Sequence, residues 1–142
     1  MGWFKFLIYF ALWAGALLNI ANGIMQITGY IYLQEGVEPE IVYRAFPDLK
    51  FFDVLFGFAT CLLGIFVIVT RFSLAKFKVS GPIMLYAVHV FVIILNLLNN
   101  GIRTSITGAN ATGTILGSLI GGVIIIAIHV KYFNNRKHLF IN

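Results

Sequence analysis

Residues 18–29 read LNIANGIMQITG, and residues 95–108 read LNLLNNGIRTSITG. Both stretches keep the order Leu-Asn, a second Asn, Gly-Ile and a closing Ile-Thr-Gly, and both lie late in a long apolar run. The second stretch is longer because of insertions at Asn100 and within residues 103–105. The pattern predicts a tandem duplication, in which one long helix and its neighbour occur twice.

The apolar runs around these stretches are long enough to cross a membrane. Apolar residues make up 60% of the 142-residue chain and charged residues only 11%, which leaves too little polar surface for a soluble globule. Four stretches contain no Lys, Arg, Asp or Glu, and each can supply the roughly 17 to 25 residues of a transmembrane helix: residues 6–34, 54–70, 79–102 and 104–130. The sequence predicts an all-α membrane protein, a single four-helix bundle over residues 1–142 with spans at about 6–31, 49–70, 82–100 and 112–132.

The net charge of +5 is distributed unevenly along this layout. One side of the four spans carries Lys5, Arg71, Lys76, Lys78, Lys131, Arg136 and Lys137. The other side carries only Arg44, Lys50 and Arg103. This positive-inside pattern predicts that both termini are cytoplasmic. Since the basic residues orient the chain in a bilayer, they do not indicate a nucleic-acid partner.

The second and fourth spans extend the duplication. Gly57 stands fourteen residues before Arg71, and Gly117 stands fourteen residues before Lys131. The sequence therefore predicts two tandem helical hairpins. Both hairpins would point the same way, so that their pseudo-symmetry axis runs along the membrane normal.

Residues 34–48 are the one sizeable segment predicted outside the spans. Pro39 after Glu38 is a favourable helix start, because proline lacks only an N–H that a first turn leaves unpaired. We expect a short interfacial helix that ends before Pro47, with Asp48 as the N-cap of the second span. A strap between two spans is the simpler interpretation, and a binding element is the alternative. Residues 103–112 are expected to form a polar outer turn.

Polar side chains gather in the outer half of the predicted bundle: Asn19, Asn22, Gln26, Asp53, Asn96, Asn99 and Arg103. Interhelical hydrogen bonds worth roughly 0.6 to 2 kcal/mol each are one interpretation. The other is an outward-facing polar vestibule that holds water, a small solute or a partner's side chain. Asp53 lies close enough to the surface to pair with Arg103, Arg44 or Lys50, although an ionisable residue within a span is also a functional candidate.

His89 lies in the inner half of the third span. A neutral histidine bonded to a neighbouring helix explains it, and a proton relay is the functional alternative. The three histidines lack the spacing of metal ligands, so neither a metal site nor a cofactor is predicted. Gly117 and Ser118 lack the order of a GxSxG nucleophile motif, and no acid or base accompanies them. We therefore do not expect an enzyme.

The fourth span begins with Gly113, Gly117 and Gly121 at four-residue spacing. Small residues at this spacing form a groove that lets another helix approach closely, which matters in lipid because helix association there relies on contact. The sequence predicts a helix-packing surface here.

The opening FKFLIYFALWAG at residues 4–15, together with RFSLA at residues 71–75, resembles uncharacterised short four-span integral membrane proteins of bacteria. The resemblance implies the bacterial cytoplasmic membrane and carries no activity with it.

Two classes of function follow from these patterns. The first is a non-catalytic membrane component, such as an accessory subunit, an immunity-type protein or a self-associating bundle, whose partners are the lipid bilayer and a second copy or another membrane protein. The second is a small-solute or ion transporter or channel. Small multidrug exporters are similar in span number but use an acidic residue deep in the first span, where this chain offers only Asn19, Asn22 and Gln26.

Overall fold

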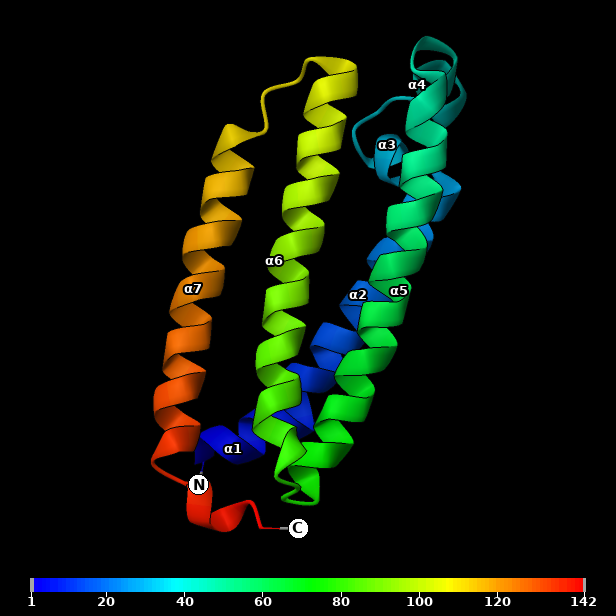
Figure 1. Ribbon diagram of the computed structural model, residues 1–142. Helices are drawn as coiled ribbons and strands as arrows, with labels where there is room; N and C mark the ends of the chain where they lie inside the picture. The colour runs from blue at the N-terminus through cyan, green and yellow to red at the C-terminus, as the bar shows by residue number, and fades with distance from the viewer. Residues whose placement is uncertain (1, 142) are drawn as a thin grey trace.

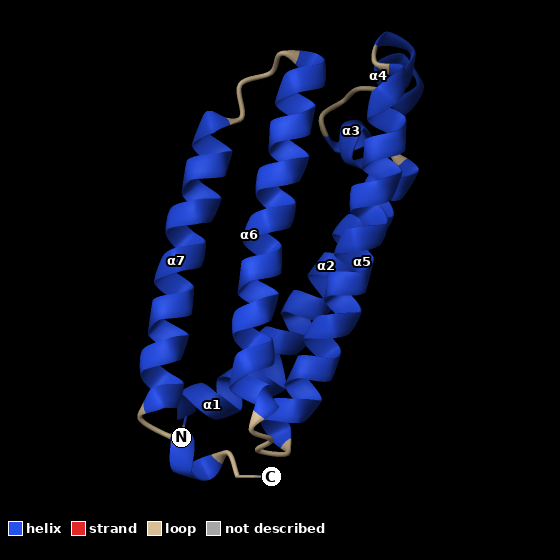
Figure 2. Cartoon of the chain, viewed as in Figure 1, coloured by secondary structure: helices blue, strands red, loops and turns tan. Residues whose placement is uncertain are grey.

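The computed structural model describes residues 2–141, and within them every regular element is helical (Figures 1 and 2). The first long helix comprises α1 (Gly2–Phe6), a π-helical segment (Leu7–Ala11) and α2 (Leu12–Thr28). The others are α5 (Pro47–Ala75), α6 (Ser80–Thr107) and α7 (Thr112–Asn134). All four are long and apolar enough to cross a membrane, which supports the predicted four-span membrane protein.

The long helices pack in the order α2, α5, α6 and α7, each against the next (Figure 1). Helix α1 lies across the foot of the bundle and reaches α7, where the Trp3 ring lies 6.1 Å from the ring of His129. The two ends of the chain lie at this foot (Figure 1). The opposite end carries the short helices α3 (Tyr30–Gln34) and α4 (Pro39–Ala45).

The foot of the bundle is filled by an apolar core. It consists of Phe4, Leu7, Ile8, Leu12, Ala16, Leu63, Val67, Leu74, Leu85, Val88, Phe133 and Phe140. Phe140 follows a 3₁₀ turn at Lys137–Leu139 and packs its ring 6.0 Å from Phe4 and 5.4 Å from Phe133. The tail therefore returns to the bundle and helps to fill its foot.

The C-terminal ends of the first and third long helices differ from the prediction. Helix α2 stops at Thr28 because Gly29 adopts a left-handed conformation with φ of 74°, so the predicted span 6–31 is divided there. The predicted polar turn at residues 103–112 begins too early, because α6 continues to Thr107 and is capped by Gly108, with φ of 72°. Only residues 108–111 connect α6 to α7. Arg103 is therefore a helical residue.

The segment between the first two spans contains the expected short helix. Helix α4 begins with Pro39 in its first turn, and Glu38 is its N-cap. The predicted N-cap of the second span is wrong: Phe46 occupies that position, and Pro47 opens α5. Proline suits a first turn because its fixed φ is preorganised for the helix and no N–H is lost.

Glycines bring α2 and α5 into close contact. A Cβ on Gly57 would lie 2.7 Å from the Gly23 carbonyl oxygen and 3.0 Å from the Ile27 nitrogen, and one on Gly64 would lie 2.9 Å from the Ala16 carbonyl oxygen. Backbone and glycine therefore meet directly, as small residues allow in membranes. The sequence pattern singled out Gly113, Gly117 and Gly121 instead, which lie in open space among the described residues.

Gly57→Ala is expected to destabilise the protein by about 1 to 3 kcal/mol, because the new methyl group meets backbone that cannot move aside. Gly101→Ala is the matched control, since a Cβ there meets nothing within 4 Å. That change should be neutral or stabilising by about 0.5 to 1 kcal/mol. Denaturant unfolding in mixed micelles, followed by circular dichroism, measures both. Equal stability of the two variants would contradict the close contact.

Candidate functional site

Asp53 is fully buried and accepts hydrogen bonds from four helices. Its Oδ1 accepts from Nη2 of Arg103 on α6 at 2.6 Å and from Nε2 of Gln26 on α2 at 3.4 Å. Its Oδ2 accepts from the hydroxyls of Tyr32 on α3 at 2.6 Å and Tyr43 on α4 at 3.2 Å. A carboxylate offers about four lone-pair sites, so these four donors occupy all the acceptor sites of Asp53.

The sequence offered three possible cations for Asp53, and the structure pairs it with Arg103. The same Nη2 donates to the Tyr32 hydroxyl at 3.0 Å, and the guanidinium carbon lies 5.3 Å from the centre of the Tyr32 ring. The Arg103 side chain is 25% exposed, whereas that of Asp53 is 1% exposed. The pair therefore joins α5 to α6 in a largely dehydrated setting, where leaving one partner alone is costly.

The two tyrosines are held as neutral donors. Burial raises the pKa of Tyr43 from 10.0 to about 12, and the Asp53 carboxylate contributes to the rise. Burial and the hydrogen bond to Asp53 also raise the pKa of Tyr32. Both phenols keep their protons at neutral pH, so α3 and α4 stay bonded to the end of the bundle. The sequence analysis did not predict either tyrosine as a partner of Asp53. The available signal was a carboxylate within a span, which needs hydrogen-bond donors, close in sequence to a segment that contains tyrosines.

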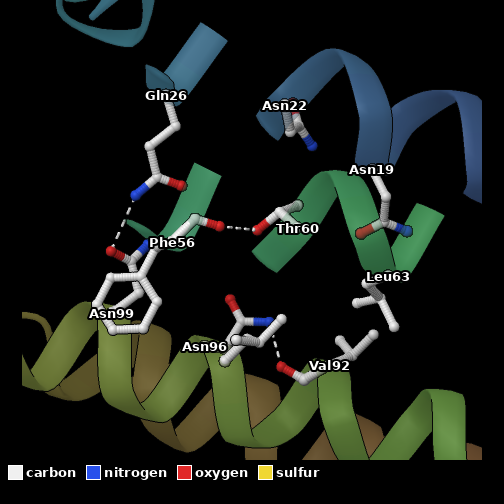
Figure 3. Close-up of a pocket in the computed structure, with 10 residues that line it drawn as sticks. Asn19, Asn22, Gln26, Phe56, Thr60, Leu63, Val92, Asn96 and Asn99 are labelled. Carbon is white, nitrogen blue, oxygen red and sulfur yellow. Dashed lines mark hydrogen bonds between the residues drawn. The ribbon is translucent and has the colours of Figure 1, made fainter. Parts of the chain in front are cut away.

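A polar cavity of about 200 Å³ lies between α2, α5 and α6 (Figure 3). Its polar lining is formed by Asn19, Asn22, Gln26, Thr60, Asn96 and Asn99. The structure thus brings together five of the residues that the sequence placed in a polar outer layer, and it adds Thr60. Asp53 and Arg103 lie outside this lining and connect to it through Gln26.

The amides of the cavity are bonded mainly within their own helices. Asn19 donates from Nδ2 to the Gly15 carbonyl at 2.7 Å, and Asn96 donates to the Val92 carbonyl at 2.9 Å. Gln26 donates to Oδ1 of Asn99 at 3.1 Å, which joins α2 to α6. The interhelical interpretation therefore describes Gln26 and Asn99, whereas Asn19 and Asn96 do not bridge helices in residues 2–141.

His89 of α6 meets a second histidine, His129 of α7. Its Nε2 lies 3.1 Å from Nδ1 of His129, and the two rings stack with centroids 5.0 Å apart. His129 is 2% exposed. A neutral pair satisfies this geometry with one ring donating to the other, and the pair joins α6 to α7. A proton-relay role for His89 stays a prediction.

Comparisons of the chain with protein-family models, with curated proteins and with solved structures find no match.

Arg103→Leu is expected to destabilise the protein by about 3 to 5 kcal/mol, because it leaves the buried Asp53 carboxylate without its cation. The double variant Asp53→Asn with Arg103→Leu should recover most of that loss, since neither charge then remains. Free energies of unfolding in lipid and detergent micelles, measured for both single variants and the double variant, give the coupling. Simple addition of the two single losses would contradict an interacting pair.

Stability should decline at high pH through the tyrosines. Tyr43 has a pKa of about 12 in the folded protein against 10.0 ordinarily, so its contribution is complete below pH 10 and is lost as the pH rises through about 12. Tyr43→Phe should show a smaller decline over this range, because the ionising group is gone. The measurement is the free energy of unfolding against pH for both proteins. Identical pH profiles would show that Tyr43 is not coupled to folding.

Proposed function

We propose that the protein is a non-catalytic membrane component that acts by helix association, with α7 packing against α7 of a second copy. The observation that carries this proposal is the open space beside the glycines on one face of α7. Helix α7 packs on α6, and a Cβ on Gly113, Gly117 or Gly121 would meet nothing within 4 Å among residues 2–141.

The rest of the chain shows how its small residues are used. Gly23, Gly57 and Gly64 lie in the close contact of α2 with α5, and Gly122 of α7 packs against Ile93 of α6. The stripe of Gly113, Gly117 and Gly121 lies on a different face of α7 from Gly122 and has no such neighbour in the described part of the chain. In lipid, helices associate through close contact rather than water exclusion, so this stripe suits another helix of the same kind.

The proposal also includes the orientation of the bundle in the membrane and the membrane in which the protein resides. The basic residues of the loops and tail accompany the end of the bundle where both termini lie (Figure 1), which favours a cytoplasmic position for that end. We place the protein in the cytoplasmic membrane of a bacterium. The duplication is supported by two shared details: Gly29 and Gly108 both end their helices with positive φ, and Asn19 and Asn96 both bond to the carbonyl four residues earlier.

Small-solute transport is the second candidate, and the polar cavity is the observation that favours it. Transport across the bilayer would require the apolar core at the foot to open, since Leu63 lines the cavity and also belongs to that core.

Cysteine crosslinking in native membranes tests the association. With Cys61→Ser as the background, Ile124→Cys should form a disulfide-linked dimer, because Ile124 is exposed on the side of α7 that carries the glycine stripe. Ile126→Cys is the matched control, since it lies one turn from Gly122 on the side that faces α6. Adding Gly117→Leu should reduce the dimer about tenfold, which corresponds to ~1.4 kcal/mol.

Gly101→Leu supplies a second control, because it makes the same change at an open glycine of α6. It should leave the crosslinked dimer unchanged. A chain with Ile124→Cys that stays monomeric, or that links only to a protein of another mass, would refute association with a second copy.

A further inference from the structure

We propose that the cavity between α2, α5 and α6 is a binding site for a small uncharged polyol, either free or as the glycerol head group of a lipid. This proposal does not depend on the association through α7. It rests on which hydrogen-bonding atoms face the cavity, on its charge, and on its position in the membrane.

Asn19, Asn96 and Thr60 present hydrogen-bond acceptors to the cavity. A backbone carbonyl can only accept, so the bonds to the Gly15 and Val92 carbonyls fix Nδ2 of Asn19 and Asn96 as donors and leave both Oδ1 atoms free. The Thr60 hydroxyl donates to the Phe56 carbonyl at 2.8 Å and keeps lone pairs on Oγ1. Figure 3 shows the oxygen of Asn96 turned away from Val92 and towards the space near Thr60 and Asn22. Such a site suits a ligand with several O–H donors.

The cavity carries no charge of its own. Asp, Glu, Lys, Arg and His are missing from its lining in the described part of the chain. The nearby Asp53 and Arg103 neutralise each other, and both oxygens of Asp53 are already bonded. An ion in this setting would lack the counter-charge that offsets its desolvation. The ligand is therefore uncharged.

One side of the cavity is apolar, being formed by Leu63, Val92 and Leu95. These side chains can contact a carbon skeleton while the amides meet its hydroxyl groups. The volume of about 200 Å³ exceeds the ~150 Å³ of a cavity that holds benzene. A molecule with glycerol's six non-hydrogen atoms therefore fits, with room for water.

The cavity lies at a depth where its amides need a partner. Asn19 stands nine residues before the end of α2, about 14 Å below that end at 1.5 Å per residue. This depth falls within a hydrocarbon layer about 30 Å thick. Unpaired polar atoms cost free energy there. A bound polyol, or water in its place, would supply the missing hydrogen bonds.

Access is from the side of the bundle. The apolar core closes the cavity towards the foot at Leu63, and the bond from Gln26 to Asn99 lies towards the other end. Asn22 is exposed although it lines the cavity. A lateral opening at Asn22 lets both sources of the ligand reach the site: a free polyol and the glycerol head group of a membrane lipid.

Binding of tritiated glycerol to the protein in phosphatidylcholine nanodiscs tests the proposal. We expect saturable binding that is at least about tenfold weaker, a loss of ~1.4 kcal/mol, in Asn96→Leu and in Asn22→Leu. Because Asn22 is exposed, the second variant keeps the test valid if the first folds poorly. The control Ala59→Leu fills a neighbouring groove of about 310 Å³ that has an apolar lining, and it should bind glycerol as the wild type does. So should Gly117→Leu, which separates this proposal from the association through α7.

A second arm distinguishes the two sources. Dioleoylglycerol added to the nanodiscs should displace the tritiated glycerol if a lipid head group is the ligand, and should leave it bound if the free polyol is preferred. The proposal is overturned if neither compound binds, if binding survives Asn22→Leu, or if the site binds ²²Na⁺ in place of glycerol.

Thermal unfolding distinguishes a ligand-binding role of Asn96 from a structural one. Asn96→Leu should unfold at or above the wild-type temperature, since its amide bonds only within its own helix. A lower unfolding temperature together with unchanged glycerol binding would mean that Asn96 is structural, and would overturn the proposal.

Discussion

The buried carboxylate of Asp53 is the constraint on which the end of the bundle depends. A charge in that position is tolerated only when it is paired and fully hydrogen-bonded, and one helix cannot supply enough donors. Arg103, Gln26, Tyr32 and Tyr43 therefore converge from four helices. Their convergence holds the strap of α3 and α4 against the bundle and fixes α6 beside α5. It also commits the Asp53 carboxylate to structure, so that this acid does not charge the neighbouring cavity.

The two halves of the bundle are held together by different kinds of contact. At the foot, aromatic and aliphatic side chains from both ends of the chain close the interior. In the other half, Gly23 and Gly57 draw α2 onto α5, while α6 approaches through amides and the ion pair. Glycine contact brings backbones together, whereas amide side chains keep helices further apart. The polar cavity is the space that results. Helix α7 lies at the edge of the bundle, and within residues 2–141 a Cβ on any glycine of its stripe would meet nothing within 4 Å.

Much of the fold could be predicted because lipid imposes simple rules on a sequence. Charge-free runs of this length form helices when they cross hydrocarbon, because a helix pairs its own backbone groups. Pro39 predicted the start of the helix between the first two spans. The same reasoning placed Asn19, Asn22, Gln26, Asn96 and Asn99 at similar depth, and they do surround one cavity. It misplaced the end of α6, because a charged residue such as Arg103 is expected in a loop outside the membrane unless a buried partner for it is known. Once the guanidinium reaches Asp53, the helix can continue past it to Thr107.

The sequence by itself determined the number of apolar helices, the strap between the first two, and the layer in which the polar side chains lie. These properties follow from hydrophobic length and from helical rise, which are local. Only the tertiary structure decided which donors meet Asp53, that His89 meets His129, that Phe140 returns to the core, and which glycines are in contact. Those outcomes depend on the rotation of each helix about its axis. In lipid, that rotation is set by the match of neighbouring side chains rather than by exposure to water.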